Sequence, residues 1–199
     1  MQKSEGHKMV EIAVDLMTNL VSNEAGLGPR EISRTFNIST SAAHRLVTSL
    51  ERKKFLQFEE STKKYKIGIG ALRFSRGVMG KSDIIHVAQP YMERLCKVID
   101  ETICLNTVVD NKRMTIFQVE SNQELRYTTK IGKLYPIYIG ASGKAILAHM
   151  SDSQRDMVIK ENVTNNQYEE LVKELEEVRK ENFSISYGER ISGGIGIAV

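Results

Sequence analysis

The chain has 199 residues, of which 41% are hydrophobic and 27% charged, and its formal net charge is +3. This length can hold one large or two small domains, and the composition is that of an ordinary globular protein. The longest apolar runs fall far short of the roughly 20 residues of a membrane span, and the first ten residues are too polar for a secretory leader. We therefore expect a cytoplasmic protein with no membrane partner.

The residue types that usually carry catalysis or bind metals are few and scattered. The two cysteines, Cys96 and Cys104, form no C-x-x-C pair, so packing in the core is a better interpretation than metal binding or nucleophilic chemistry. The four histidines, at positions 7, 44, 86 and 149, form no cluster with a serine, cysteine or carboxylate. We expect no catalytic residue, no metal, no cofactor and no enzymatic activity.

Positive charge is concentrated near the N-terminus. Residues 29–66 contain nine Lys or Arg and four Glu, a local excess of five positive charges in a chain whose net charge is +3. A basic block in one domain is typical of a protein that binds the phosphate backbone of nucleic acid, although basic surface also occurs without such a partner.

Three helices are predicted in the first third of the chain. The first covers residues 9–20, a second begins at Pro29 after a Gly28 cap, and a third begins after a Ser39 cap and runs to about Lys53. The apolar positions expected on one face of the first helix are Val10, Val14, Leu16, Met17 and Leu20. Ile32 and Phe36 mark the buried side of the second, and the third buries Ala43, Leu46, Val47 and Leu50.

A hairpin follows these helices. Residues 55–58 and 65–67 have the pattern of two short strands, and the polar residues 59–64 form the turn between them. Three helices followed by a two-stranded ribbon predict a winged helix-turn-helix over residues 1–67.

The rest of the chain is predicted to form a linker and an α+β domain. Residues 68–82, with Leu72, Ser75, Val78 and Met79, indicate a linking helix that continues through Gly77 and Gly80. A longer helix begins near Asp83, and Pro90 marks either its start or a kink. The apolar face expected for this helix is Ile84, Ala88, Leu95 and Val98.

Residues 83–199 then alternate between strand and helix patterns. Strands are expected at 103–109, 113–120 and 125–131, followed by helices at 142–150, from Ser151 onward and around 168–178, and by strands at 183–187 and 195–199. We expect an antiparallel sheet with flanking helices.

The third helix carries the strongest functional pattern. A helix that enters the major groove needs short side chains at its N-terminal end, because bulky ones hold its backbone away from the base edges. Arg45 lies one turn further on the same side, where it can reach a guanine edge or a phosphate. The residues predicted to contact DNA from this helix are Ser39, Thr40, Ser41, Ala42, His44, Arg45 and Thr48.

The tip of the hairpin supplies further positive charge. Lys63 and Lys64 are placed to contact a phosphate strand or the minor groove. Lys53 and Lys54 are weaker candidates, because they can equally form the polar end of the third helix. The alternative is a winged domain that contacts another protein.

A glycine-bearing segment, YPIYIGASGKAIL, precedes the helix predicted at 142–150. It fails as a nucleotide phosphate loop, because Tyr138 stands where that motif has its first glycine and Ala145 follows Lys144 where Ser or Thr is required. Two interpretations remain: a loop whose amide groups hold a small anion at the start of a helix, or a tight turn without a ligand.

The whole chain resembles the IclR-type transcription regulators. The resemblance runs through EIAVDLM, EISRTFNISTSAAHRLVTSLERKKFL, the wing ending in YKIG, GASGKAILA and YGERISGGIGIAV. It implies a GAF-like effector domain at residues 83–199 and a homodimer or dimer of dimers bound to double-stranded operator DNA near metabolic genes. Because the chain ends earlier than the family pattern, we expect a final strand and helix to be missing and the effector domain to be incomplete.

The resemblance also implies where an effector binds. The residues that it assigns to the effector cavity are Ala141, Ser142, Gly143, Ser186, Tyr187 and Gly196. Ser186 and Gly196 stand where some members have an acidic residue and a cysteine, so a different ligand or a different binding mode is expected. The favoured function is a ligand-responsive DNA-binding regulator, with repression favoured over activation and a small organic acid as effector. The alternative is a metabolite-binding or protein-interaction module whose winged domain contacts a protein instead of DNA.

Overall fold

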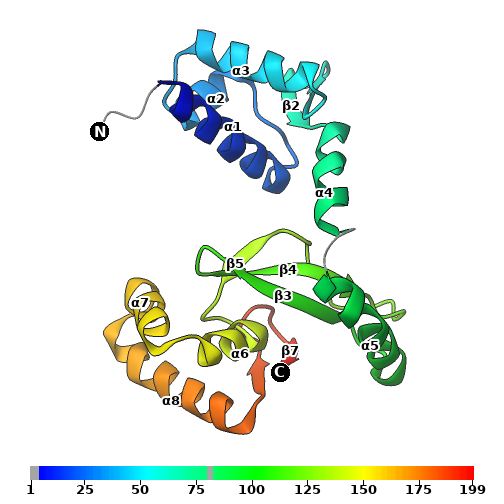
Figure 1. Cartoon of the computed structure of the whole chain (residues 1–199), viewed down its shortest axis with the longest axis vertical. Helices are drawn as coiled ribbons and strands as arrows, with labels where there is room; N and C mark the ends of the chain where they lie inside the picture. The colour runs from blue at the N-terminus through cyan, green and yellow to red at the C-terminus, as the bar shows by residue number, and fades with distance from the viewer. Residues whose placement is uncertain (1–4, 80–82) are drawn as a thin grey trace. The chain divides into compact units, whose positions relative to one another are not determined.

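The structure, a computed structural model, describes residues 5–79 and 83–199. The chain divides into two compact units, residues 1–82 and residues 83–199, and each is described by itself (Figure 1). No helix in the described ranges is long and apolar enough to cross a membrane. The predicted continuation of the linking helix through Gly80 to residue 82 lies outside the described residues.

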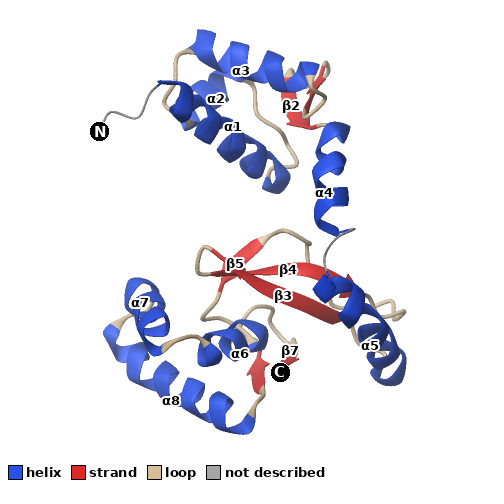
Figure 2. Cartoon of the chain, viewed as in Figure 1, coloured by secondary structure: helices blue, strands red, loops and turns tan. Residues whose placement is uncertain are grey.

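The first unit is a winged helix-turn-helix in which three helices precede a two-stranded hairpin (Figure 2). Its elements are α1 (Glu5–Ser22), α2 (Pro29–Thr35), α3 (Thr40–Arg52), β1 (Leu56–Glu59), β2 (Lys64–Ile67), a 3₁₀ turn (Ile69–Ala71) and α4 (Leu72–Met79). The strands pair antiparallel, with Phe58 opposite Tyr65. The prediction of three helices and a wing is confirmed, with small shifts at the ends of elements.

Local hydrogen bonds fix the start of α2 and α3 and the turn between them. The Gly28 amide donates to the Glu31 carboxylate at 2.7 Å, and the Ser39 hydroxyl accepts from the Ala42 amide at 3.2 Å. The Ser33 hydroxyl donates to the Ile38 carbonyl at 2.6 Å and closes the turn, in which Asn37 adopts a φ of 49°. Caps of this kind satisfy amide groups that have no partner within the helix.

The core of this unit is built on a different face of α1 from the one predicted. Ile12, Leu16 and Leu20 are buried, whereas Val10 is 65% exposed and Val14 is 52% exposed. Side chains four residues apart lie above one another on a helix, and Val10 and Val14 fall about half a turn away from that row. The expectation for these two valines was therefore wrong, although Leu16 and Leu20 were placed correctly.

The base of the wing is packed tightly against the beginning of α4. Gly70 approaches so closely that a side-chain carbon there would lie 2.6 Å from the Lys54 carbonyl oxygen, and the Gly70 amide donates to that oxygen at 2.8 Å. The rings of Phe55 and Phe74 stack with their centroids 5.0 Å apart. The hairpin and α4 are thus joined by backbone and side-chain contacts.

The second unit combines two antiparallel sheets with four helices. Its elements are α5 (Asp83–Ile99), β3 (Ile103–Val109), β4 (Lys112–Val119), β5 (Leu134–Pro136), α6 (Ala141–His149), α7 (Asp152–Asn162), α8 (Asn165–Glu181), β6 (Ser184–Tyr187) and β7 (Ile195–Ala198). The strand order is β3-β4-β5 in one sheet and β6-β7 in the other. The α+β prediction for this unit is confirmed.

The third strand of the larger sheet is not the one predicted. Residues 125–131 contain no strand; instead the chain turns at Gly132, and β5 pairs with the beginning of β4, with Tyr135 opposite Arg113. The alternation of Leu125, Tyr127 and Thr129 resembles a strand, but Leu125 is 94% exposed. Thr129 on the same side is buried, but residues 122–126 are exposed, so burial does not hold the beginning of this segment against the sheet.

Helix α5 begins before Pro90 and packs on β3 and β4 through another face than predicted. Pro90 lies well inside the helix, so it is not the start; His86, whose carbonyl loses its amide partner, is exposed to water. The buried residues are Ile85, Met92 and Cys96. The expected face is largely exposed instead, with Ile84 at 58% and Val98 at 76%.

A separate core joins α6, α7 and α8. Ile137, Leu147, Ile159 and Leu175 are almost completely buried in it. Fully burying a side chain of this size contributes about 1.5–3 kcal/mol. This cluster holds α6 in place, and α6 in turn contacts both strands of the β6-β7 sheet.

Candidate DNA-binding surface and effector site

Helix α3 presents one polar face to solvent. Ala43, Leu46 and Val47 are buried against the core, and Ser41, Arg45 and Thr48 are exposed on the opposite side. Their spacing of three and four residues puts them in one row along the helix. The row has short side chains at its beginning and a guanidinium one turn later, which is what a base-reading helix requires.

The other predicted contact residues lie beside this row or at the start of α3. Thr40 and His44 are exposed beside the row, and Ala42 is half-buried. Ser39 caps the helix, and its hydroxyl also lies 3.0 Å from that of Ser41. Ser39 therefore already has a structural role in the absence of DNA.

The two lysines of the wing differ in their contacts. Lys63, at a φ of 58° in the turn, pairs with Glu60 at 2.6 Å, and both side chains are more than two-thirds exposed. Lys64 is 31% exposed, and its ammonium group lies 3.3 Å from Glu31. Exposed ion pairs contribute little, so Lys63 is the more available of the two for a phosphate.

One basic residue on this surface was not among the predicted contacts. Arg52 follows Arg45 by seven residues, which places it on the same row of α3, and it is exposed. The i, i+7 spacing of two arginines could have identified it from the sequence.

Two amides at the start of α6 already donate to side chains of the chain itself. The Gly140 amide donates to the Glu189 carboxylate at 3.0 Å, and the Ala141 amide donates to the Ser186 hydroxyl at 3.0 Å. An anion bound by these two amides would have to displace both partners. The tight-turn interpretation of the glycine segment therefore fits the structure better than the anion loop.

The predicted effector residues are only partly brought together. A side-chain carbon at Gly196 would lie 3.0 Å from the Ser186 hydroxyl and 3.5 Å from the Ala141 methyl group, so these three positions adjoin. Ser142 is half-buried, and Tyr187, on the other face of β6, is 71% exposed. Gly143 is confined by packing, because a side chain there would overlap the Ile137 carbonyl oxygen.

A buried lysine fastens the loop between β6 and β7 to α6. The ammonium group of Lys144 lies 2.7 Å from Glu174 of α8 and 2.7 Å from Glu189 of the loop. Burial lowers the pKa of Lys144, but the hydrogen bonds and charges of the two carboxylates outweigh burial and raise it above 10.5.

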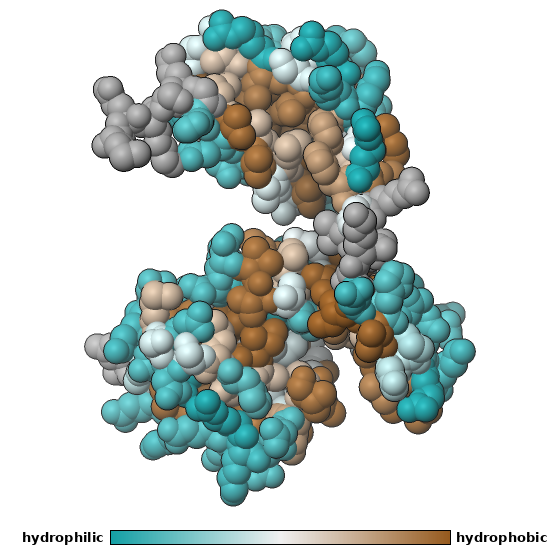
Figure 3. Space-filling model, viewed as in Figure 1, coloured by the Kyte–Doolittle hydropathy of each residue, from teal (hydrophilic) through white to brown (hydrophobic). Residues whose placement is uncertain are grey.

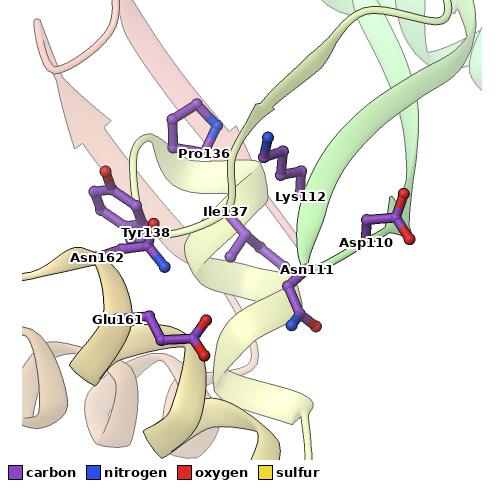
Figure 4. Close-up of a pocket in the computed structure, with 8 residues that line it drawn as sticks. All are labelled: Asp110, Asn111, Lys112, Pro136, Ile137, Tyr138, Glu161 and Asn162. Carbon is purple, nitrogen blue, oxygen red and sulfur yellow. The ribbon is translucent and has the colours of Figure 1, made fainter. Parts of the chain in front are cut away.

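A small cavity of about 190 Å³ lies near the β3–β4 turn, but it includes none of the predicted effector residues. Figure 4 shows its walls: the turn, the segment after β5 and the end of α7. The lining residues are Asp110, Asn111, Lys112, Pro136, Ile137, Tyr138, Glu161 and Asn162. Among the described residues, no group of three His, Cys, Asp or Glu side chains is placed to hold a metal ion.

The winged helix-turn-helix and the separate α+β unit define a class, the two-domain DNA-binding transcription regulators. Residues 9–60 match the IclR helix-turn-helix domain, and residues 76–199 match the family model described as bacterial transcriptional regulator IclR C-terminal. The chain belongs to the IclR family of ligand-responsive DNA-binding transcriptional regulators.

Individual relatives agree with this assignment. The chain is 28% identical over 180 residues to the HTH-type transcriptional regulator KipR of Bacillus subtilis, covering 87% of this chain and 72% of that protein. An IclR regulator from Alicyclobacillus acidocaldarius has the same fold, with a TM-score of 0.83 at 22% identity over 96% of this chain and 80% of that one. An IclR homologue from Microbacterium hydrocarbonoxydans, solved with 4-hydroxybenzoate, gives a TM-score of 0.77 at 20% identity over 96% and 82%.

Proposed function

We propose that this regulator reads operator DNA with the exposed row of α3 and binds the adjacent phosphates with the wing. The observation that carries the proposal is the row itself, in which Ser41, Arg45 and Thr48 face solvent on a helix whose other face is buried. Arg45 is the base-reading residue, because a guanidinium donates two hydrogen bonds to a guanine edge. Lys63 contacts phosphate and contributes affinity without sequence preference.

A gel-shift titration against selected genomic fragments tests this assignment. We expect Arg45→Ala to remove most of the preference for the selected sequence, at a cost of about 1–3 kcal/mol on that sequence. Lys63→Ala should weaken selected and random sequences alike and reduce the dependence on salt. An Arg45→Ala variant with unchanged sequence discrimination would contradict the proposed role of α3.

We propose that the effector is a small organic acid bound by the second unit, with Ala141, Ser186 and Gly196 in one wall of its site. The adjoining positions of these residues support that location, and the related structure solved with 4-hydroxybenzoate supports an acid as ligand. The effector shifts DNA affinity only by as much as it favours one arrangement of the protein over another. Gel shifts with and without the acid measure this change in DNA affinity.

We also propose that the chain works in the cytoplasm as a homodimer. Hydrophobic side chains are visible on the surface of the second unit (Figure 3), and α5 carries five at helical spacing: Ile84, Val87, Tyr91, Leu95 and Val98, each at least 47% exposed. A row of this kind on a water-facing helix is typical of an interaction surface, and a second copy offers the same row. Light scattering on Leu95→Lys tests it: a loss of dimer mass is expected, and an unchanged mass would contradict this surface.

A further inference from the structure

Three cationic side chains lie close to the ring of Tyr135 in the second unit. The guanidinium carbon of Arg113 lies 5.0 Å from the ring centre, that of Arg190 lies 4.4 Å from it, and the ammonium nitrogen of Lys133 lies 5.3 Å from it. Arg190 also lies 4.9 Å from the ring of Tyr127. The aromatic faces offset part of this positive charge, but they do not neutralise it.

The fold itself brings the two arginines together. Arg113 on β4 is paired with Tyr135 on β5 in the sheet register, so their side chains lie on the same face of the sheet. Arg190 comes from the loop between β6 and β7, where its neighbour Glu189 is tied to Gly140 and Lys144. The backbone next to Arg190 is thus held in place by the contacts of Glu189.

Arg113 is an unusual buried charge. It is 3% exposed, and its Nε has no hydrogen-bond partner within the part of the chain that the structure describes. Its one strong contact is a hydrogen bond of 2.8 Å from Nη1 to the Asn106 side-chain oxygen. Among the described residues no carboxylate lies within ion-pair distance of Arg113 or Arg190, although buried charges in proteins are normally paired.

The charge of Arg113 acts on Arg190. Burial lowers the pKa of Arg113, and burial followed by the charge of Arg113 lowers the pKa of Arg190. The guanidinium group of Arg113 therefore disfavours the charge of Arg190. An anion between them would remove this repulsion and supply the missing hydrogen-bond acceptor.

We infer that Arg113 and Arg190 form a binding site for the carboxylate of a small organic molecule, beside the Tyr135 ring that both guanidinium groups contact. A carboxylate accepts paired hydrogen bonds from a guanidinium, which a neutral amide does not reproduce. This inference rests on the proposed ligand-responsive function and names the group that anchors the acid. The start of α6 does not compete for it, because Glu189 and Ser186 already occupy the amides there.

Calorimetric titration of the full chain tests the site with three probes: 4-hydroxybenzoate, succinate and the neutral 4-hydroxybenzamide. Wild type should bind at least one of the carboxylates and gain thermal stability from it, and it should not bind the amide. Arg190→Gln and Arg113→Gln should each weaken that binding about tenfold or more, because each removes a charge-assisted hydrogen bond. Arg190 is half-buried, so its variant tests the site even if Arg113→Gln does not fold.

A matched control is Arg179→Gln, which makes the same change of charge on the exposed side of α8 and should leave carboxylate binding unchanged. The inference is wrong if neither carboxylate binds wild type, or if Arg190→Gln binds as tightly as wild type. Gel shifts without any probe separate this failure from that of the proposed function. If the chain binds operator DNA but no carboxylate, only the carboxylate site is contradicted. If the chain binds no DNA fragment, the proposed function itself is contradicted.

Discussion

The ammonium group of Lys144 lies 2.7 Å from the carboxylate of Glu189, and this ion pair ties α6 to the loop that carries Arg190. Glu174 approaches the same ammonium group from α8 at the same distance. The Lys144 side chain is only 8% exposed. This one buried cation thus joins α6 to α8 and to the loop between β6 and β7, which lie 30 and 45 positions further along the chain.

Replacement of Lys144 by Met should destabilise the second unit. The change leaves two carboxylates facing each other without their shared partner, and we expect a loss of about 2 kcal/mol, below the 3–5 kcal/mol of a fully buried pair because both carboxylates are about one-third exposed. Urea unfolding measures it. Lys180→Met, at an exposed pair with Glu181, is the control, and equal losses in the two variants would contradict a special role for Lys144.

The same contact predicts a dependence on alkaline pH. The pKa of Lys144 is raised above 10.5 in the folded chain, so its contribution is fully present below 10.5 and is lost as the pH rises through the folded value. The difference in unfolding free energy between wild type and Lys144→Met should therefore be constant between pH 7 and 9 and shrink above 10.5. A difference that does not change across that range would exclude the ionised contact as its source.

Gly143 should be intolerant of a side chain for structural reasons. A methyl group there would overlap the Ile137 carbonyl oxygen, and forced overpacking of this kind costs about 1–3 kcal/mol. Gly77→Ala in α4 is the matched control, because a side chain there meets nothing within 4 Å; it should stabilise the chain by roughly 0.5–1 kcal/mol. If Gly143→Ala unfolds like wild type in thermal melts, the packing role is wrong.

The link between α2 and the wing should weaken in acid. The hydrogen bond from the Gly28 amide and the contact with Lys64 hold the pKa of Glu31 below 4.5. Its contribution is thus present above pH 4.5 and is lost as the pH falls through the lower folded value. Glu31→Gln should lower stability at pH 7 but have little effect below that value, as measured by chemical unfolding at each pH. Equal effects at both pH values would contradict this account.

The sequence predicts the first unit well because its signals are local. Gly28 and Pro29 begin one helix and Ser39 caps the next, so caps and apolar periodicity fix the elements with little help from the rest of the fold. The face of α1 is harder to predict. It has apolar residues on more than one side, and tertiary packing decides that Ile12 is buried and Val10 is not.

The second unit depends on contacts between distant segments, which periodicity does not reveal. Residues 125–131 alternate like a strand, yet β5 forms at Leu134–Pro136, where Gly132 returns the chain to β4. The pairing of Glu189 with Gly140 spans 49 positions, and the approach of Arg190 to Tyr135 spans 55. No local rule predicts either contact, so the sequence does not reveal that Arg113 and Arg190 both lie beside Tyr135.

The stacked rings of Phe55 and Phe74, together with the close approach of Gly70 to Lys54, fix the beginning of α4 to the base of the wing. A rotation of α4 therefore has to turn the hairpin with it, and with the hairpin the helix that carries Arg45. A movement of the beginning of α4 would in this way reach the exposed row of α3 that we propose to contact DNA.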